Sequence, residues 1–199
     1  MKILGLTGSI GMGKSATAAM FREAGIPVYD ADAEVHALYA KGGAAVGPLS
    51  ERFGDILKDG AVDRAALRAQ VVDDPDAMKD LEAIVHPLVG LSQLNFRQKA
   101  LESGAAFAVL DIPLLYETGG DARCDYVAVV SAPPEIQRDR VLARGEMSEA
   151  EFEQIRAKQM SDADKRARAD FIISSAFGFD FARAHVQAII QLLTEGEND

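Results

Sequence analysis

The sequence predicts an α/β fold in which a five-stranded parallel sheet is flanked by helices. Five short apolar runs, rich in β-branched and aromatic residues, are typical of strands buried on both faces of a parallel sheet. Amphipathic stretches with helical periodicity lie between them, and this alternation favours right-handed βαβ connections. The strands are expected at Lys2–Thr7, Ile26–Tyr29, Phe107–Ile112, Tyr126–Ser131 and Asp170–Ser174.

Helices are expected after several of these strands. Ser15–Ala24 follows a glycine-rich segment, Pro134–Arg144 begins with the proline that suits a first helical turn, and Phe181–Thr194 carries an apolar stripe. Residues 30–102 contain no convincing strand and are expected to form a helical insertion. Its helices are predicted at Ala33–Tyr39, Pro48–Phe53, Arg64–Val72 and Asp76–Glu102. Pro87 is expected to bend or split the last of them, because proline lacks an amide donor.

This organisation predicts two domains. Residues 1–29 and 103–199 form the core, and residues 30–102 form the helical domain. Within the core, the densely charged segment Glu146–Arg168, with the residues from about 140 onward, is expected to form a short helical lid. The insertion and the lid both follow the carboxyl ends of strands, where ligands bind in open α/β sheets.

Charge and composition exclude several classes of protein. The 199 residues include 21 Lys and Arg against 31 Asp and Glu, a net charge of −10, which argues against general binding to nucleic acid or anionic membranes. The single cysteine, Cys124, excludes an intramolecular disulfide framework. No signal peptide is expected, because the apolar run at the start of the sequence is too short for one, and no stretch approaches the roughly 20 apolar residues of a membrane span. We therefore expect a soluble, cytoplasmic protein, a monomer or weak homo-oligomer.

The most specific motif is Gly8-Ser9-Ile10-Gly11-Met12-Gly13-Lys14-Ser15. It matches the G-x-x-x-x-G-K-[ST] pattern of a phosphate loop and lies between an expected strand and helix. Its glycines let the backbone approach phosphate oxygens, and the helix that follows adds its positive amino-terminal end. Lys14 is expected to bind the β- and γ-phosphates and Ser15 to ligate Mg²⁺. The motif therefore predicts a P-loop NTPase core that binds a nucleoside triphosphate.

Two carboxylates follow the second strand. Asp30 and Asp32 would share one face if the strand stays extended there, and either is suited to accept a proton from an acceptor hydroxyl. We favour Asp32 as this base. The alternatives are that Asp32 only caps the next helix and that Asp30 only belongs to a turn.

A third acidic position lies at the end of the strand at Phe107–Ile112. Asp111 is placed to orient Mg²⁺ through water, or else to cap a loop. In the next segment, Glu117 is expected to face the same cleft, whereas Leu115 and Tyr116 suit packing or a substrate wall.

Basic side chains are concentrated between Arg138 and Arg168. Most of them are expected to be solvated, since acidic residues are interspersed. Arg140 and Arg144 are four residues apart on one helix face and are expected to reach the ATP phosphates when the lid closes. His36 and His86 have both structural and functional interpretations.

Taken together, these motifs resemble the dephospho-CoA kinase family over nearly the whole chain. The resemblance rests on the phosphate loop followed by five further segments. They are Asp30-Ala31-Asp32 with His36, Leu81–Val89 with His86-Pro87, Asp111–Glu117, Gln137–Val141 with Arg144 and Gln159, and Ala169–Ile173. The sequence departs from the usual family pattern at Ala16, at Tyr116 and at Ser174-Ser175.

The resemblance implies transfer of the ATP γ-phosphoryl group to the ribose 3′-hydroxyl of dephospho-CoA, the last step of CoA biosynthesis, with Mg²⁺. It implies that Asp32 is the base and that Lys14 and Arg140 stabilise the transferring group. The ATP site would comprise Gly8, Gly11, Met12, Gly13, Lys14, Ser15, Ala16, Arg140 and Arg144. The acceptor site would comprise Asp32, His86, Leu115, Tyr116 and Glu117.

From the residues alone, two other functions stay open. One is a kinase for a nucleoside, nucleotide or sugar acid on the same core. The other is a nucleotide-binding regulatory module that hydrolyses slowly and signals by switching. The absence of an Asn-Lys-x-Asp guanine signature weakens the interpretation as a GTPase switch.

Overall fold

The computed structural model describes residues 1–195, which divide into two compact units. The first unit comprises Met1–Tyr29 with Ala100–Asp199, and the second comprises Asp30–Lys99. No helix within residues 1–195 is long and apolar enough to cross a bilayer.

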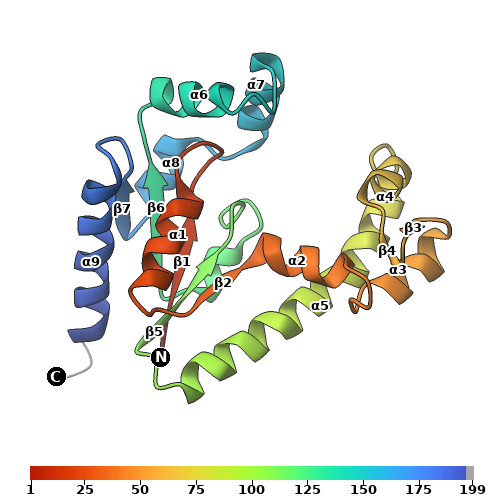
Figure 1. Ribbon diagram of the computed structural model, residues 1–199, viewed down its shortest axis with the longest axis horizontal. Coiled ribbons are helices and arrows are strands. Elements are labelled where there is room, and N and C mark those ends of the chain that lie inside the picture. The colour runs from red at the N-terminus through yellow and green to blue at the C-terminus, as the bar shows by residue number, and fades with distance from the viewer. Residues whose placement is uncertain (196–199) are drawn as a thin grey trace. The chain divides into compact units, whose positions relative to one another are not determined.

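A five-stranded parallel sheet organises the first unit, as predicted (Figure 1). Its strand order is β2-β5-β1-β6-β7. The strands span β1 Lys2–Thr7, β2 Val28–Asp30, β5 Phe107–Asp111, β6 Tyr126–Ser131 and β7 Phe171–Ser174. In the register of the central pair, Leu6 lies opposite Asp111. The loops after β1 and β5 therefore leave the sheet side by side.

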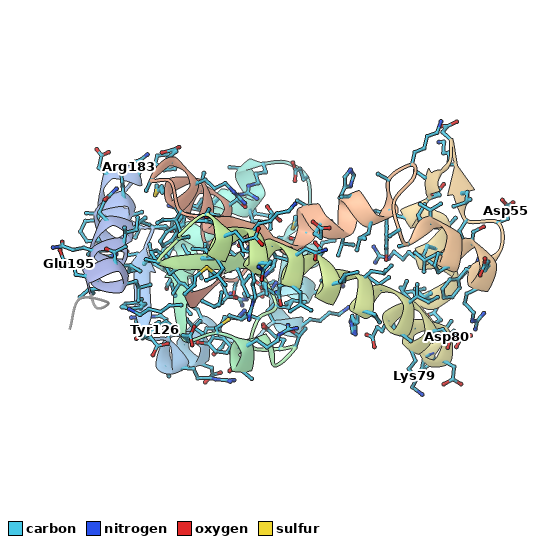
Figure 2. The ribbon with its side chains drawn as sticks, turned by 90° about the horizontal axis from the view of Figure 1, so that it is seen from below. Asp55, Lys79, Asp80, Tyr126, Arg183 and Glu195 are labelled. Atoms are coloured by element: carbon cyan, nitrogen blue, oxygen red, sulfur yellow. The ribbon has the colours of Figure 1, made fainter. Side chains whose placement is uncertain are left out.

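Helices cover both faces of this sheet because strand side chains alternate. On β6, Ala128 and Val130 point into a core shared with α1 and α9. Val127 and Val129 belong to a cluster on the opposite face, against the segment after β5. Arg183 on α9, labelled in Figure 2, pairs with Glu23 on α1 at 2.7 Å. The helices of this unit are α1 Lys14–Glu23, the 3-10 turn Gly120–Arg123, α6 Pro134–Ala143, α7 Glu149–Lys158, α8 Asp162–Arg168 and α9 Phe179–Glu195.

The second unit is built mainly from helices around its own apolar core. It contains α2 Ala31–Tyr39, α3 Val46–Phe53, α4 Arg64–Val71 and most of α5 Pro75–Glu102. The expectation that residues 30–102 lack strands is wrong, because β3 Leu57–Lys58 and β4 Ala61–Val62 pair antiparallel. Asp59 and Gly60 between them have φ of 54° and 82°, as a tight two-residue hairpin turn requires. The Asp-Gly dipeptide was the signal for this hairpin.

Pro87 does not split the long helix, so this half of the prediction that it bends or splits the helix is wrong. Helix α5 continues through Pro87 from Pro75 to Glu102. Residues on both sides of the proline, including Val85 and Leu88, pack into the same core. This packing holds the two halves together, because tertiary contacts outweigh the single hydrogen bond that proline removes.

Asp30 and Asp32 do not lie on one extended strand, because β2 ends at Asp30. Asp30 is the N-cap of α2, and its side chain accepts a hydrogen bond from the Ala33 amide at 3.0 Å. Asp32 therefore lies inside the first helical turn. Helix α2 begins earlier than predicted because Asp30 supplies the side-chain oxygen that a helix start requires.

Candidate active site

The phosphate loop connects β1 directly to α1, as predicted. Gly13 is the N-cap of α1 with φ of 91°, and no side chain caps the helix. The first turn of α1 also contains no acidic residue. The first amides of a helix have no partner within it, so Lys14, Ser15 and Ala16 present donors to an anion at the positive end of the helix.

Gly11 is required at its position by both conformation and space. Its φ is 76°, a region that residues with a Cβ rarely adopt. A Cβ there would lie 2.5 Å from Val141 Cγ2 and 3.0 Å from the Gln137 carbonyl oxygen, both on α6. The loop therefore packs tightly against α6. Gly8, at the end of β1, is similarly close to β6, because a Cβ would lie 2.7 Å from the Val130 carbonyl oxygen.

Ser175 joins Arg140 to the phosphate loop. Its hydroxyl donates to the Met12 carbonyl at 2.7 Å and accepts from Arg140 Nη1 at 2.8 Å. Arg140 Nη2 donates to the Ser175 carbonyl at 2.7 Å. The Met12 carbonyl and the Gly13 amide belong to one trans peptide, so they point in opposite directions. Because Ser175 holds the carbonyl, the Gly13 amide points away from Ser175.

Sequence reasoning missed this role of Ser175. From the sequence, Ser174-Ser175 is only a departure from the usual family pattern. Ser175 and Met12 are 163 positions apart, and no local pattern indicates such a contact. Arg140, by contrast, was expected near the loop, and its contact with Ser175 places it there.

A cavity of about 450 Å³ opens beside the phosphate loop. This volume is within the ~300–1,000 Å³ range of small-molecule sites. Its lining combines residues of the loop and two arginines with apolar side chains. Of the residues predicted to bind ATP, it contains Gly11, Gly13, Ala16, Arg140 and Arg144, and the rest of its lining is Thr17, Met20, Ala143, Ser175, Gly178, Phe179 and Ala182.

Lys14 and Asp111 form a close ion pair. Lys14 Nζ lies 2.6 Å from Asp111 Oδ1, and the two side chains are only 14% and 3% exposed. The register of β1 and β5 brings them together across the central strand pair. Asp111, which is predicted to orient Mg²⁺ through water, therefore pairs with the ammonium group of Lys14.

The segment after β5 is more deeply buried than a substrate wall requires. Leu115 is fully buried and Tyr116 is 6% exposed, and both belong to the cluster beneath the sheet. Burial raises the pKa of Tyr116, and the Arg168 guanidinium 4.3 Å from its ring centre opposes that rise. These two side chains pack the core, and their predicted contact with an acceptor is untested.

Glu117 turns toward the predicted lid. Its Oε1 lies 2.9 Å from Lys165 Nζ and accepts the Met160 amide at 2.8 Å. Burial raises the pKa of Glu117, but the hydrogen bonds from Lys165 and Met160 outweigh this effect and hold the pKa below its usual value. Lys165 is itself fully buried on α8.

The remaining predicted residues lie in the second unit. Asp32 and His36 are one helical turn apart on α2, and both are exposed. His86 is exposed on α5, within a continuous helix rather than at the expected break.

A phosphate loop between the central strand and first helix of a five-stranded parallel sheet, with Lys14 at its end and Arg140 joined to it through Ser175, defines a nucleotide-binding protein of the P-loop class. The protein-family profile described as dephospho-CoA kinase matches residues 2–178. A dephospho-CoA kinase from Jannaschia sp. is 54% identical over 193 residues, covering 97% of each chain. The chain belongs to the dephospho-CoA kinase family and is an ATP-dependent kinase.

Solved structures agree with this assignment. The crystal structure of TT1252 from Thermus thermophilus is 34% identical, with a TM-score of 0.80, and the match covers 98% of this chain and 97% of that one. Dephospho-CoA kinase from Campylobacter jejuni is 25% identical, with a TM-score of 0.72 and 98% of each chain covered. The similarity therefore includes both units of this chain.

We predict that Gly11→Ala weakens ADP binding by roughly tenfold or more, because both backbone strain and the contact with α6 displace the loop. Isothermal titration calorimetry measures the dissociation constant. Gly25→Ala is the matched control, since Gly25 has φ of 80° but nothing within 4 Å of an added Cβ. Equal ADP affinity in the two variants would contradict the prediction.

A second prediction concerns pH and Glu117. A carboxyl whose folded-state pKa is depressed stabilises the protein above its unfolded pKa of roughly 4.3 and loses this contribution as pH falls through the folded pKa. Wild type is therefore expected to be more stable than Glu117→Gln at pH 7, and the difference should shrink toward pH 3. Urea denaturation at several pH values tests this. A difference that is independent of pH would be the contrary result.

Proposed function

We propose that this kinase transfers the γ-phosphoryl group of ATP to the ribose 3′-hydroxyl of dephospho-CoA, giving CoA and ADP. The observation that carries the proposal is the match of the dephospho-CoA kinase profile to residues 2–178. It spans both the phosphate loop and the helical unit. The core supplies a nucleotide site, and we assign the acceptor to the helical unit because it contains Asp32 and His86.

ATP binds along the phosphate loop in this proposal. The amides of the loop and of the first turn of α1 receive the phosphate oxygens, and Lys14 binds the β- and γ-phosphates. The 450 Å³ cavity takes the base, because apolar side chains such as Met20 and Phe179 line it. Arg140 and Arg144 lie on the wall of that cavity, where a guanidinium stabilises negative charge on the transferring group.

The residues present fit a Mg²⁺ ion that arrives with the nucleotide. Among residues 1–195, no group of three or more His, Cys, Asp or Glu side chains is arranged to hold a metal, so a cage made only of protein ligands is not available there. Ser15 and Asp111 suffice, since Mg²⁺ keeps several waters and binds through one or two protein groups plus phosphates. When bound, the ion neutralises charge on the β- and γ-phosphates.

Asp32 is the proposed general base. Its neighbour Asp30 already accepts a hydrogen bond as the N-cap of α2, whereas the Asp32 side chain is exposed. In the transfer, the 3′-hydroxyl oxygen bonds to the γ-phosphorus, the bond from that phosphorus to ADP breaks, and Asp32 accepts the hydroxyl proton. His86, Leu115, Tyr116 and Glu117 stay proposed acceptor-site residues.

We expect Asp32→Asn to lower kcat about 10²–10⁴-fold with little change in KM, because proton acceptance operates in the transition state. A coupled assay of ADP release measures both constants. Asp30→Asn is the matched control, since asparagine also caps helices, and it should retain most of its activity. A large loss in Asp30→Asn with none in Asp32→Asn would reverse the assignment.

The acceptor is tested with a panel of alcohols in the presence of ATP and Mg²⁺. We expect rapid ADP release with dephospho-CoA and little with nucleosides, nucleoside monophosphates or sugar acids. Strong phosphorylation of one of those alternatives, and none of dephospho-CoA, would overturn the proposed reaction. Hydrolysis of ATP that gains nothing from any alcohol would instead indicate a nucleotide switch.

A further inference from the structure

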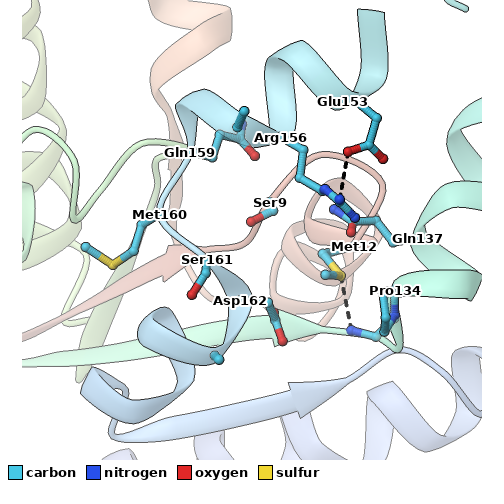
Figure 3. Close-up of a pocket in the computed structure, with 13 residues that line it drawn as sticks. Ser9, Met12, Pro134, Gln137, Glu153, Arg156, Gln159, Met160, Ser161 and Asp162 are labelled. Atoms are coloured by element: carbon cyan, nitrogen blue, oxygen red, sulfur yellow. Dashed lines mark hydrogen bonds and ion pairs between the residues drawn. The ribbon is translucent and has the colours of Figure 1, made fainter. Parts of the chain in front are cut away.

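Two glutamines outside the phosphate loop, Gln137 and Gln159, hold both backbone groups of Ile10; Figure 3 labels the two glutamines. The Ile10 amide donates to Gln159 Oε1 at 3.2 Å, and the Ile10 carbonyl accepts from Gln137 Nε2 at 2.7 Å. Gln137 is on α6 and only 3% exposed. Gln159 is the C-cap of α7, at the start of the short connection to α8. Two different elements thus fix one residue of the loop.

Peptide planarity converts these contacts into loop orientation. Because C=O and N–H of one trans peptide point in opposite directions, the bond from the Ile10 amide to Gln159 turns the Ser9 carbonyl the other way. That carbonyl accepts the Met12 amide at 3.2 Å and closes a tight turn. Likewise, the bond from Gln137 to the Ile10 carbonyl turns the Gly11 amide away from α6.

Gln159 is itself held by a buried ion pair. The neighbouring Met160 amide donates to Glu117, which pairs with Lys165 at 2.9 Å. Lys165 is fully buried, and its Nζ also donates to the Pro113 carbonyl at 3.3 Å. That carbonyl accepts the Thr7 hydroxyl at 2.9 Å, at the end of β1. The connection between α7 and α8 is therefore anchored to the strand that precedes the phosphate loop.

We propose that Gln159 is a positioning residue of the phosphate loop and that the Glu117–Lys165 pair holds it against Ile10. This assigns Glu117 a role in ATP binding through Gln159, in addition to its proposed place in the acceptor site. A lysine in a closed environment is costly unless paired, and here the pair fixes the connection on which Gln159 lies. The inference rests on the proposed binding of ATP at this loop.

Gln159→Leu removes the acceptor while keeping a side chain of similar size. We expect KM for ATP and the dissociation constant for ADP to rise roughly fivefold, the change that one neutral hydrogen bond corresponds to, with KM for dephospho-CoA unchanged. In ¹⁵N–¹H spectra, the Ile10 amide should shift and exchange faster with solvent. Gln154→Leu, an exposed glutamine on α7, is the control and should change none of these.

The second link is tested by a double-mutant cycle. Lys165→Met should raise KM for ATP as Gln159→Leu does, and the double variant should be no worse than the more affected single variant. Lys158→Met, at an exposed lysine of α7, is the control. Should Lys165→Met fail to fold, Glu117→Gln replaces it in the cycle. This variant removes the negative charge of the ion pair, while its amide oxygen still accepts from the Met160 amide.

These variants test separately the role of Gln159, the link through the ion pair and ATP binding at the loop. Unchanged ADP binding and an unchanged Ile10 resonance in Gln159→Leu would overturn the positioning role. Independent, multiplicative losses in the double variant would overturn the link through the ion pair. Lys14→Ala separates these outcomes from the proposed function. It should weaken ADP binding whatever the role of Gln159, and intact binding in that variant would instead contradict ATP binding at the loop.

Discussion

The orientation of a few peptide groups in the phosphate loop is the constraint on which the rest of the site depends. An amide binds a phosphate only if the carbonyl on the same peptide points elsewhere. In this chain the Met12 carbonyl is held by Ser175 and the Ile10 carbonyl by Gln137. The partners come from the segment after β7 and from α6. Glycine loses more conformational entropy on ordering than any other residue, so hydrogen bonds from outside the loop are needed to offset this cost and to select one shape.

The parallel sheet brings the charged groups to that loop. Leu6 and Asp111 are opposite each other in neighbouring strands, so the loop after β1 begins where Asp111 ends β5. Lys14, the first residue of the following helix, reaches Asp111 at 2.6 Å. The fold thus sets the distance between an ammonium group and a carboxylate before any ligand arrives. Preorganisation of this kind reduces the free energy spent on reorganisation when charge develops on a transferring phosphoryl group.

Much of this architecture could be predicted from the sequence, because the strands are buried on both faces. Lys2–Thr7 and Tyr126–Ser131 match the observed strands at both ends. Errors arose where a local signal was outweighed or overlooked. Pro87 is tolerated because the core packs on both sides of it, and the Asp59-Gly60 turn was passed over inside a region expected to be helical. The start of α2 was misplaced because Asp30, not Asp32, caps it.

The side chains that hold the phosphate loop could not be predicted from the sequence, for a different reason. Gln137, Gln159 and Ser175 contact the loop across 127, 149 and 163 positions. Glutamine and serine are common on helices and loops, so nothing in their local context distinguishes a supporting side chain from a solvated one. The glycine-lysine motif has a fixed spacing because phosphate geometry is fixed, whereas the side chains that hold its backbone are constrained only by tertiary placement.

The acidic balance of the chain does not prevent it from binding a polyanion. Exposed charges separated by more than about 8 Å are largely screened at physiological salt, so the net charge of −10 matters less than the groups that line the site. Helix α1 has no acid in its first turn, and the cavity beside it is lined by Arg140 and Arg144 without a carboxylate. The charge of Asp111, which contacts the loop lysine, is paired with Lys14. Local placement of charge, with the amides of the loop, therefore makes an anion site on an acidic protein.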